Sequence, residues 1–246
     1  MKRLETIDYI AKANFQDELD CADKIDIVFA MDDRLKNNFR LALYPSYKGQ
    51  RKLIKRSYNI FAITDYITDI IFKDLDVENR YGYHFVKVPG AEGDDVIATT
   101  LMNFKDRYAT TMLIASDRDF LQIEGVREFD MLGREVKRTL GDQEVTADEF
   151  LLGKILMGDK SDNIAQVFKK CGPKTALKLV KDKDELRKRL NESQDASKQF
   201  LLNKKIISFK EIPKELTDAI IEKVNIEVYD RRAKNAGTSL SDFMSW

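Results

Sequence analysis

Closely spaced carboxylates occur twice in the middle of this chain, in the motifs GAEGDD and ASDRDF. Carboxylates that meet in one crevice repel each other and lose hydration, so such a group is stable only when a cation lies among them. Oxygen ligands without histidine or cysteine favour the hard cations Mg²⁺ and Mn²⁺. The residue types therefore indicate metal-assisted chemistry by Glu92, Asp94, Asp95, Asp117 and Asp119.

Two strands, and the helix between them, must position these carboxylates. Residues 84–88 and 112–115 are short apolar runs typical of buried strands, and a helix is expected from 93 to about 108. Consecutive parallel strands of an α/β sheet deliver their C-terminal ends to the same edge. We therefore expect the five carboxylates to converge there. The earlier apolar strand KIDIVFAM ends in Asp32 and Asp33.

A basic and aromatic segment follows this first strand and precedes an amphipathic helix expected over residues 57–79. A basic run alone is more often a solvated loop or helix. Directly after carboxylates and interleaved with tyrosines, it favours a nucleic-acid partner, because phosphates attract cations and bases stack on aromatic rings. Its members are Arg34, Lys36, Arg40, Tyr44, Tyr47, Lys48, Arg51, Lys52, Lys55 and Arg56.

The flanking segments complete an α/β pattern. Residues 2–20 have apolar side chains at helical spacing, and a short helix is expected over 120–123. Residues 126–131 and 135–140 are predicted strands joined by a hairpin turn at 132–134. From Thr146 onward the pattern is helical, so we place a domain boundary near residue 145, between units of 1–145 and 146–246.

The second unit opens with a capping box of Thr146 and Glu149. An apolar helix then ends at Gly158, and Asp159 and Asp162 follow in a polar turn. The later motif CGPKT places a proline in the first turn of the next helix, where free backbone N–H groups can bind an anion. An ordinary helical hairpin is the simpler alternative. One acidic turn and one basic turn favour a metal at one end and a phosphate at the other.

Composition excludes several classes of protein. The 246 residues include 42 basic and 42 acidic side chains, so overall charge is uninformative about partners. The isolated Cys21 and Cys171 form neither a disulfide framework nor a zinc site, and they favour a reducing compartment. His84 is the single histidine, expected to be structural, which argues against Ser/His and Cys/His catalysis. We find no signal-peptide pattern and no apolar run of about 18 residues, the length of a membrane span.

Four motifs, in this order and at typical separations, resemble the 5′ nuclease family of phage 5′–3′ exonucleases, flap endonucleases and the nuclease domain of bacterial DNA polymerase I. They are DDRLKNNFRLALYPSYKGQR, GAEGDD, ASDRDF and MGDKSDNI followed by CGPKTAL. The resemblance implies an α/β, PIN-like (Rossmann-like) domain with a mostly parallel sheet and helices on both faces. It also implies a helical arch at about 34–80 and a C-terminal all-α region with a helix–three-turn–helix at about 150–180.

The resemblance also implies roles for particular residues. Lys48 is similar to the catalytic lysine at the base of the arch, acting with Asp33, Glu92 and Asp94. Tyr47 resembles a residue that stacks on a terminal base. The implied metal ligands are Asp33, Glu92, Asp94, Asp95, Asp117, Asp119, Asp159 and Asp162. The implied DNA contacts are Arg40, Tyr47, Lys48, Arg51, Lys52, Lys170, Gly172, Lys174 and Thr175.

The activity implied is hydrolysis of DNA at 5′ flaps, nicks or free 5′ ends, with RNA–DNA primers as a further substrate, in replication and repair. The expected cofactors are two Mg²⁺ ions, with Mn²⁺ as a substitute, and K⁺ at the helix–three-turn–helix. A monomer in the reducing cytoplasm of a bacterial or phage-infected cell is the expected context.

One departure from the family concerns its first strand, which is apolar, central in the sheet and ends in a metal-binding aspartate. Nothing before Lys24 resembles it, since Asp8 and Asp20 lie in a helical pattern. We therefore expect reduced activity from this polypeptide alone. The first alternative is a non-catalytic DNA-binding protein of the same fold. A Mg²⁺-dependent phosphatase is a second, although a small phosphate ester needs neither a basic arch nor a helical hairpin.

Overall fold

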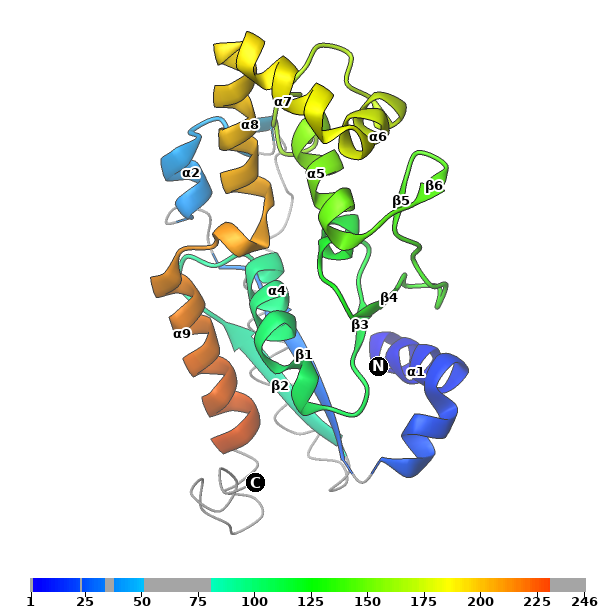
Figure 1. Cartoon of the computed structure of the whole chain (residues 1–246). Helices are drawn as coiled ribbons and strands as arrows, with labels where there is room; N and C mark the ends of the chain where they lie inside the picture. The colour runs from blue at the N-terminus through cyan, green and yellow to red at the C-terminus, as the bar shows by residue number, and fades with distance from the viewer. Residues whose placement is uncertain (1, 23, 34–37, 51–80, 231–246) are drawn as a thin grey trace.

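The structure is a computed structural model that describes residues 2–22, 24–33, 38–50 and 81–230 (Figure 1). Most of the predicted arch, including the helix expected over 57–79, lies outside the described residues, and so do Arg51 and Lys52. From the arch region the structure describes helix α2 (Phe39–Leu43) and the turn that follows it.

The described strands form parallel pairs, as expected for a PIN-like α/β fold. Strand β1 (Ile25–Met31) pairs with β2 (Tyr81–Lys87), and β3 (Met112–Ile114) pairs with β4 (Arg127–Phe129). These positions confirm the predicted strands, with ends that differ by a few residues. The single sheet that we expected is split, however, because among the described strands β1 pairs only with β2 and β3 only with β4.

Helices cover both faces of these strands, as predicted. Helix α4 (Gly93–Phe104) begins just after β2 and packs with α9 (Lys214–Val224) on one face, where Val86, Val96 and Ile220 are fully buried. Helix α1 (Lys2–Cys21) covers the other face of β3 and β4, with Ile10 and Phe15 against Phe129. Strand β3 contacts helices on both faces, because its side chains alternate: Leu113 packs with α4, and Met112 and Ile114 pack with α1.

One predicted strand, 135–140, is wrong in its extent. The turn at 132–134 exists, with Gly133 at φ 78°, and Phe129 bridges Glu135 in antiparallel fashion. Only β5 (Thr139–Leu140) is a strand, and it pairs with β6 (Gln143–Glu144). The side chain of Arg138 donates hydrogen bonds to the carbonyls of residues 121 and 123. It therefore contacts the end of the short helix η5 (Arg118–Gln122) and not β4.

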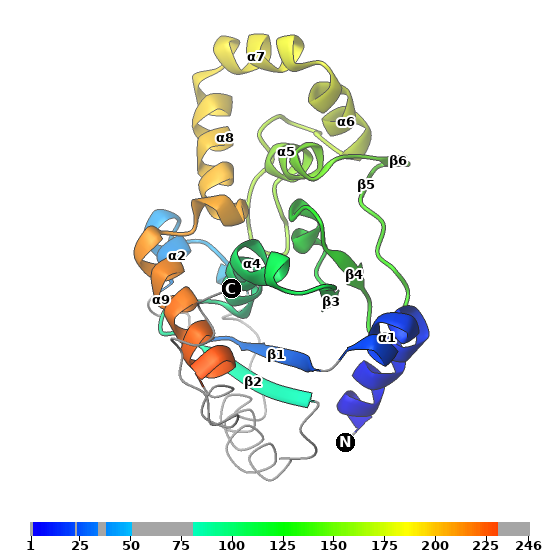
Figure 2. The ribbon, with the colours of Figure 1, turned by 60° about the horizontal axis from the view of Figure 1, so that its bottom comes forward.

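The second half is helical, as predicted, and its residues 147–207 form an upper layer in Figure 2. Its elements are α5 (Ala147–Met157), α6 (Pro173–Lys181), α7 (Lys183–Glu192), α8 (Gln194–Ile207), η6 (Phe209–Glu211), α9 and a π-helical turn η7 (Asn225–Asp230). The capping box of Thr146 and Glu149 is present. Helix α9 returns to the first half and packs against α4 and β2.

Two further sequence expectations concern single side chains and membrane spans. His84 is buried, 2.8 Å from the carbonyl oxygen of Glu227 and 2.9 Å from Asp26 Oδ1, so its role is structural as expected. Among the helices that the structure describes, none has the length and apolar character needed to span a membrane.

Candidate functional site

The N-terminus of α4 is built by two of the predicted acidic residues. Glu92 is the N-cap of the helix, and its backbone N–H donates to Asp95 Oδ2 at 3.0 Å, which completes a capping box. Carboxylates are favoured here because they satisfy free N–H groups and oppose the helix dipole. Both side chains are buried, at 5% and 0% exposure. The motif GAEGDD therefore folds as a rigid helix start directly after β2.

Arg40 holds this helix start from the opposite side. Its guanidinium donates to both carboxylate oxygens of Asp95, at 3.0 and 2.7 Å, and to Glu92 Oε2 at 3.2 Å. Its Nε donates to the carbonyl of Ile206 at 2.9 Å, which ties α2 and α4 to α8. The planar fork of arginine matches a carboxylate in this two-point geometry. Since Arg40 is 3% exposed, its side chain contacts protein on all sides.

Glu92 accepts hydrogen bonds from three side chains. Lys48 Nζ lies 2.5 Å from Oε1, while the Tyr47 hydroxyl and Arg40 lie 2.9 and 3.2 Å from Oε2. Burial raises the pKa of Tyr47 far above its usual range, so the phenol stays neutral and donates. Tyr47 and Lys48 are both buried, which brings the two predicted DNA contacts inside the carboxylate cluster.

The same two residues link the first half of the chain to the turn after α5. The Lys48 backbone N–H donates to the carbonyl of Asp162 at 3.0 Å, and Lys48 Nζ lies 3.9 Å from the Asp162 carboxylate. The Tyr47 hydroxyl lies 3.3 Å from that carboxylate. Lys48 has φ 51°, a left-handed conformation that costs a non-glycine residue about 1–3 kcal/mol. Its backbone and side-chain contacts hold it there.

Asp94 is the residue at which negative charge accumulates. Burial, followed by the charge of Asp117, raises its pKa to about 7. The charge of Lys48 opposes this rise, while Glu92 and Asp32 contribute to it. Carboxylates that follow β1, β2 and β3 thus lie close enough to influence one another.

The two aspartates that follow β1 are oriented differently. Asp32 Oδ1 accepts a hydrogen bond from the backbone of Gly93 at 2.7 Å, at the start of α4. Asp33 Oδ2 accepts from the backbone of Gly90 at 2.9 Å, in the turn before it. The sequence reasoning selected Asp33 and omitted Asp32. The alternation of side chains at a strand end was the available signal, since it turns neighbouring residues to opposite sides.

A second acidic group lies around Lys154, which the sequence reasoning also missed. Lys154 Nζ is 2.6 Å from Asp119 and 3.1 Å from Asp159. Burial raises the pKa of Asp119. Burial also raises that of Asp159, but hydrogen bonds from Ser161 and the charge of Lys154 outweigh this and lower it. The exposed Asp117 accepts from the backbone of Asp119 at 2.9 Å, so it links this group to Asp94.

Glu128 is a further acidic residue that the sequence reasoning did not single out. It lies on β4, is 4% exposed, and neither carboxylate oxygen has a hydrogen-bond partner. Burial and the charge of Asp117 raise its pKa to about 7. Near the end of β3 and β4, the basic side chains therefore do not neutralise all of the acidic ones.

The donor set fits a hard divalent cation, because it consists of carboxylate oxygens whose mutual repulsion is incompletely compensated. Lys48 and Lys154 neutralise part of this negative charge through their ion pairs. Among the residues that the structure describes, no group of three or more His, Cys, Asp and Glu side chains is arranged to hold a metal ion. The predicted ligands are thus gathered near one edge but are not assembled into a metal centre.

The turns between α5 and α6 form the other predicted contact surface. Gly158 ends α5 with φ 64°, and a Cβ there would lie 2.4 Å from the carbonyl oxygen of Ala165. Gly172 is the N-cap of α6, where a Cβ would meet nothing within 4 Å. The space beside its Cα is therefore open, while its backbone N–H donates to the carbonyl of Lys170 at 3.0 Å. The exposed lysines of this region are Lys169, Lys170, Lys174 and Lys178.

Parallel strands with carboxylates at their C-terminal edge, followed by a helical pair with a basic turn, define a PIN-like α/β protein of the nuclease class. Residues 12–149 match the family model described as 5′-3′ exonuclease, N-terminal resolvase-like domain, and the chain belongs to this family.

Curated relatives are consistent with this family. A 5′-3′ exonuclease of Buchnera aphidicola subsp. Schizaphis graminum is 27% identical over 183 residues, covering 72% of this chain and 58% of the relative. The DNA polymerase I of Caldicellulosiruptor bescii is 26% identical over 227 residues, covering 86% of this chain and 25% of the relative. The chain thus spans less than two thirds of the length of these proteins.

Solved structures share the fold. The bacteriophage T5 5′-exonuclease with bound zinc has a TM-score of 0.59 at 19% identity, covering 95% of this chain and 87% of that one. The T5 flap endonuclease in a complex with DNA and metal ions has a TM-score of 0.55 at 17% identity, covering 93% and 87%.

Proposed function

We propose that this chain is the nuclease unit of a 5′–3′ exonuclease or flap endonuclease that hydrolyses DNA at 5′ flaps, nicks and free 5′ ends. The observation that supports this most is the position of Asp94, beside Asp117, Asp32 and Glu92 and within the electrostatic influence of Lys48. An uncompensated group of carboxylates next to a lysine is suited to bind a divalent cation and a phosphate together. Activity on RNA–DNA primers belongs to the same proposal.

In this proposal Asp32, Asp94 and Asp117 hold the cation, Mg²⁺ or Mn²⁺, with Asp33, Asp119, Asp159 and Asp162 close by. A bound divalent cation supplies activated water and stabilises the charge on the leaving oxygen. A second cation would be held by Asp119 and Asp159, both of which are paired with Lys154 in this structure. We keep K⁺ at the turns between α5 and α6 as a prediction.

The chain's own residues divide into two groups. Lys48 directs a fixed positive charge toward the scissile phosphate, and charge aimed at the transition state is usually the largest catalytic contribution. Glu92 positions Lys48. We reassign Arg40 and Asp95 to a structural role, because each is buried and occupied by the other. Tyr47 also has a structural role in this proposal, because its hydroxyl donates a hydrogen bond to Glu92.

Duplex DNA is proposed to bind at the turns before α6. The backbone N–H group of Thr175 and the charges of Lys170 and Lys174 suit phosphate oxygens, and the open space beside Gly172 lets a phosphate approach. Contacts to phosphates position DNA without reading its bases, so the selectivity is for structure rather than for sequence. Binding should weaken steeply as salt is raised, because each phosphate contact releases counterions.

A labelled 5′-flap duplex tests the proposal. We expect cleavage in Mg²⁺, no cleavage after EDTA, and at least about a 100-fold loss in Asp94→Asn. The matched control is Asp142→Asn, because Asp142 is an exposed carboxylate in the β5–β6 turn. Tight flap binding without cleavage in Mg²⁺ or Mn²⁺ would identify the non-catalytic alternative. The ion pairs of Lys48 and Lys154 favour this alternative, because they occupy carboxylates that would otherwise bind the cation. Hydrolysis of a small phosphate ester alone would identify a phosphatase.

A further inference from the structure

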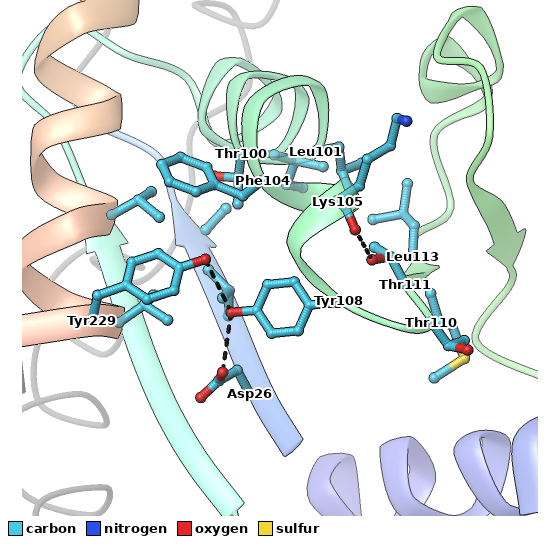
Figure 3. Close-up of a pocket in the computed structure, with 16 residues that line it drawn as sticks. Asp26, Thr100, Leu101, Phe104, Lys105, Tyr108, Thr110, Thr111, Leu113 and Tyr229 are labelled. Atoms are coloured by element: carbon cyan, nitrogen blue, oxygen red, sulfur yellow. Dashed lines mark hydrogen bonds between the residues drawn. The ribbon is translucent and has the colours of Figure 1, made fainter. Parts of the chain in front are cut away.

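Glu128 occupies a position on β4 whose neighbours are apolar. In the parallel pairing of β3 with β4 it lies opposite Leu113, and side chains at paired positions point to the same face. Leu113 packs in an apolar cluster with α4, and it lines a cavity together with Leu101 and Phe104 (Figure 3). Val126, two positions before Glu128, packs against the same cluster. The chain therefore places a carboxylate on the apolar face of this strand pair.

The carboxylate of Glu128 is enclosed but unpaired. The residue is 4% exposed, and neither of its oxygens has a hydrogen-bond partner. The charge of Arg118 acts on Glu128, but this arginine donates instead to the hydroxyl and the carbonyl of Thr139, at 3.2 and 3.3 Å. An unpaired carboxylate inside a protein is costly, and a bound ion is one way to offset that cost.

Asp117 is the acidic residue that acts most strongly on Glu128. The hydrogen bonds between β3 and β4 extend to Ala115, whose N–H donates to the carbonyl of Phe129 at 3.0 Å, and Asp117 follows two residues later. The charge of Asp117 raises the pKa of Glu128 and also that of Asp94, so Asp117 lies near both carboxylates. Asp117 itself is exposed, which gives a cation a route from solvent to this pair.

We propose that Glu128 is a further ligand of the divalent cation and binds it together with Asp117. This inference rests on the proposed function, because it adds a residue to the cation site proposed there. Two carboxylates are sufficient, since Mg²⁺ is usually bound by one or two of them and keeps several waters. A cation on this pair offsets the repulsion between the two carboxylates and gives the oxygens of Glu128 the partner that the protein does not supply.

Binding of Mn²⁺ tests the proposal without a nuclease assay. The full chain is titrated with Mn²⁺ at pH 8, and the free ion is followed by electron paramagnetic resonance. We expect Glu128→Gln, which keeps the shape of the side chain and removes its charge, to weaken binding at least ten-fold. The matched control is Glu144→Gln, which alters an exposed carboxylate on β6 and should leave binding unchanged. Unchanged affinity in Glu128→Gln overturns the proposal, and so does a chain that binds no Mn²⁺ at millimolar concentration.

A double variant tests whether Asp117 and Glu128 share one ion. Asp117→Asn should also weaken Mn²⁺ binding at least ten-fold. The double variant Asp117→Asn/Glu128→Gln should weaken binding by clearly less than the product of the two single losses, because side chains that share a partner are not additive. Losses that multiply would mean that the two carboxylates act independently, which would overturn a shared site.

The inference and the proposed function can fail separately. If Asp94→Asn loses both Mn²⁺ binding and flap cleavage while Glu128→Gln binds Mn²⁺ normally, the nuclease function stands and this inference is wrong. If the chain binds Mn²⁺ through Glu128 but cleaves no flap, the role of Glu128 stands and the nuclease function is wrong.

A second measurement uses the unaltered chain, so it does not depend on the folding of a variant. Fe²⁺ binds sites of this kind at least as tightly as Mn²⁺, and with ascorbate and peroxide it generates radicals that cut the backbone beside its ligands. We expect cuts within residues 127–129 as well as next to Asp117, both suppressed by excess Mg²⁺. Cuts next to Asp117 with none at 127–129 would overturn the proposal. Circular dichroism establishes whether Glu128→Gln folds, and the Fe²⁺ cuts provide the test if it does not.

Discussion

The guanidinium of Arg40 forms two parallel hydrogen bonds with the carboxylate of Asp95, although 55 positions separate them in the chain. Both residues are almost completely buried. A buried ion pair is costly to break, because the partner that remains is left charged and unpaired. The pair therefore controls whether α2 and the start of α4 stay together, and hence whether Lys48 and Glu92 meet.

Replacing Arg40 with alanine should lower the free energy of unfolding by about 3–5 kcal/mol, the usual cost of leaving a buried charge unpaired. Urea denaturation measures this loss. Arg187→Ala is the matched control, since Arg187 pairs with Asp184 in an exposed ion pair and should change stability by less than about 1 kcal/mol. Equal losses in both variants would contradict a structural role for Arg40.

Lys48 and Lys174 should separate catalysis from binding. Lys48→Met should slow single-turnover flap cleavage by about 100-fold or more, because a charge aimed at the phosphate is lost. Lys174→Ala should weaken binding and reduce the salt dependence of binding by about one charge, while single-turnover cleavage at saturating protein stays nearly unchanged. Fluorescence anisotropy across salt concentrations measures binding. Similar behaviour of the two variants would remove the basis for assigning them different roles.

Glu128 should make stability depend on pH. Its pKa is raised from 4.5 to about 7 in the fold, so between these values the folded chain binds more protons than the unfolded chain. Stability from this residue therefore falls as pH rises from about 4.5 to about 7. Glu128→Gln should flatten that part of the profile and stabilise the protein at pH 8.

Chemical denaturation at several pH values, without metal, measures this effect. Glu144→Gln serves as the control because Glu144 is exposed on β6, and it should leave the profile unchanged. If the dependence of stability on pH were the same in Glu128→Gln, ionisation of Glu128 would not destabilise the folded state.

Two glycines near the proposed DNA contact should respond differently to a methyl group. Gly158→Ala should destabilise the protein by more than about 1 kcal/mol, since its φ is positive and the added Cβ would meet the Ala165 carbonyl. Gly172→Ala should cost less, about 0.5 kcal/mol, because its φ is −86° and the space is open, so that only the poorer capping by alanine counts. Thermal melts compare the two. A larger loss of stability in Gly172→Ala than in Gly158→Ala would contradict the open space beside Gly172.

Local patterns made much of the fold predictable. Apolar runs located β1 to β4, and the spacing of Thr146 and Glu149 located the start of α5, because these features depend on neighbours in the sequence. The partners of Asp95 and Asp119 were not predictable in this way. Arg40 and Lys154 reach them from helices that meet only in the folded chain. The choice between Asp32 and Asp33 likewise depended on the exact register of β1.

The return of α9 to the first half has a consequence for how the protein is made. Val224 of α9 and Val228 of η7 complete the apolar layer over β2 and α4. A ribosome must therefore synthesise the chain through residue 228 before that layer can close. A fragment that stopped at residue 145 would expose the apolar surface of β2 and α4 to water and would tend to aggregate. Attempts to trim the protein to a minimal size should retain residues 214–230.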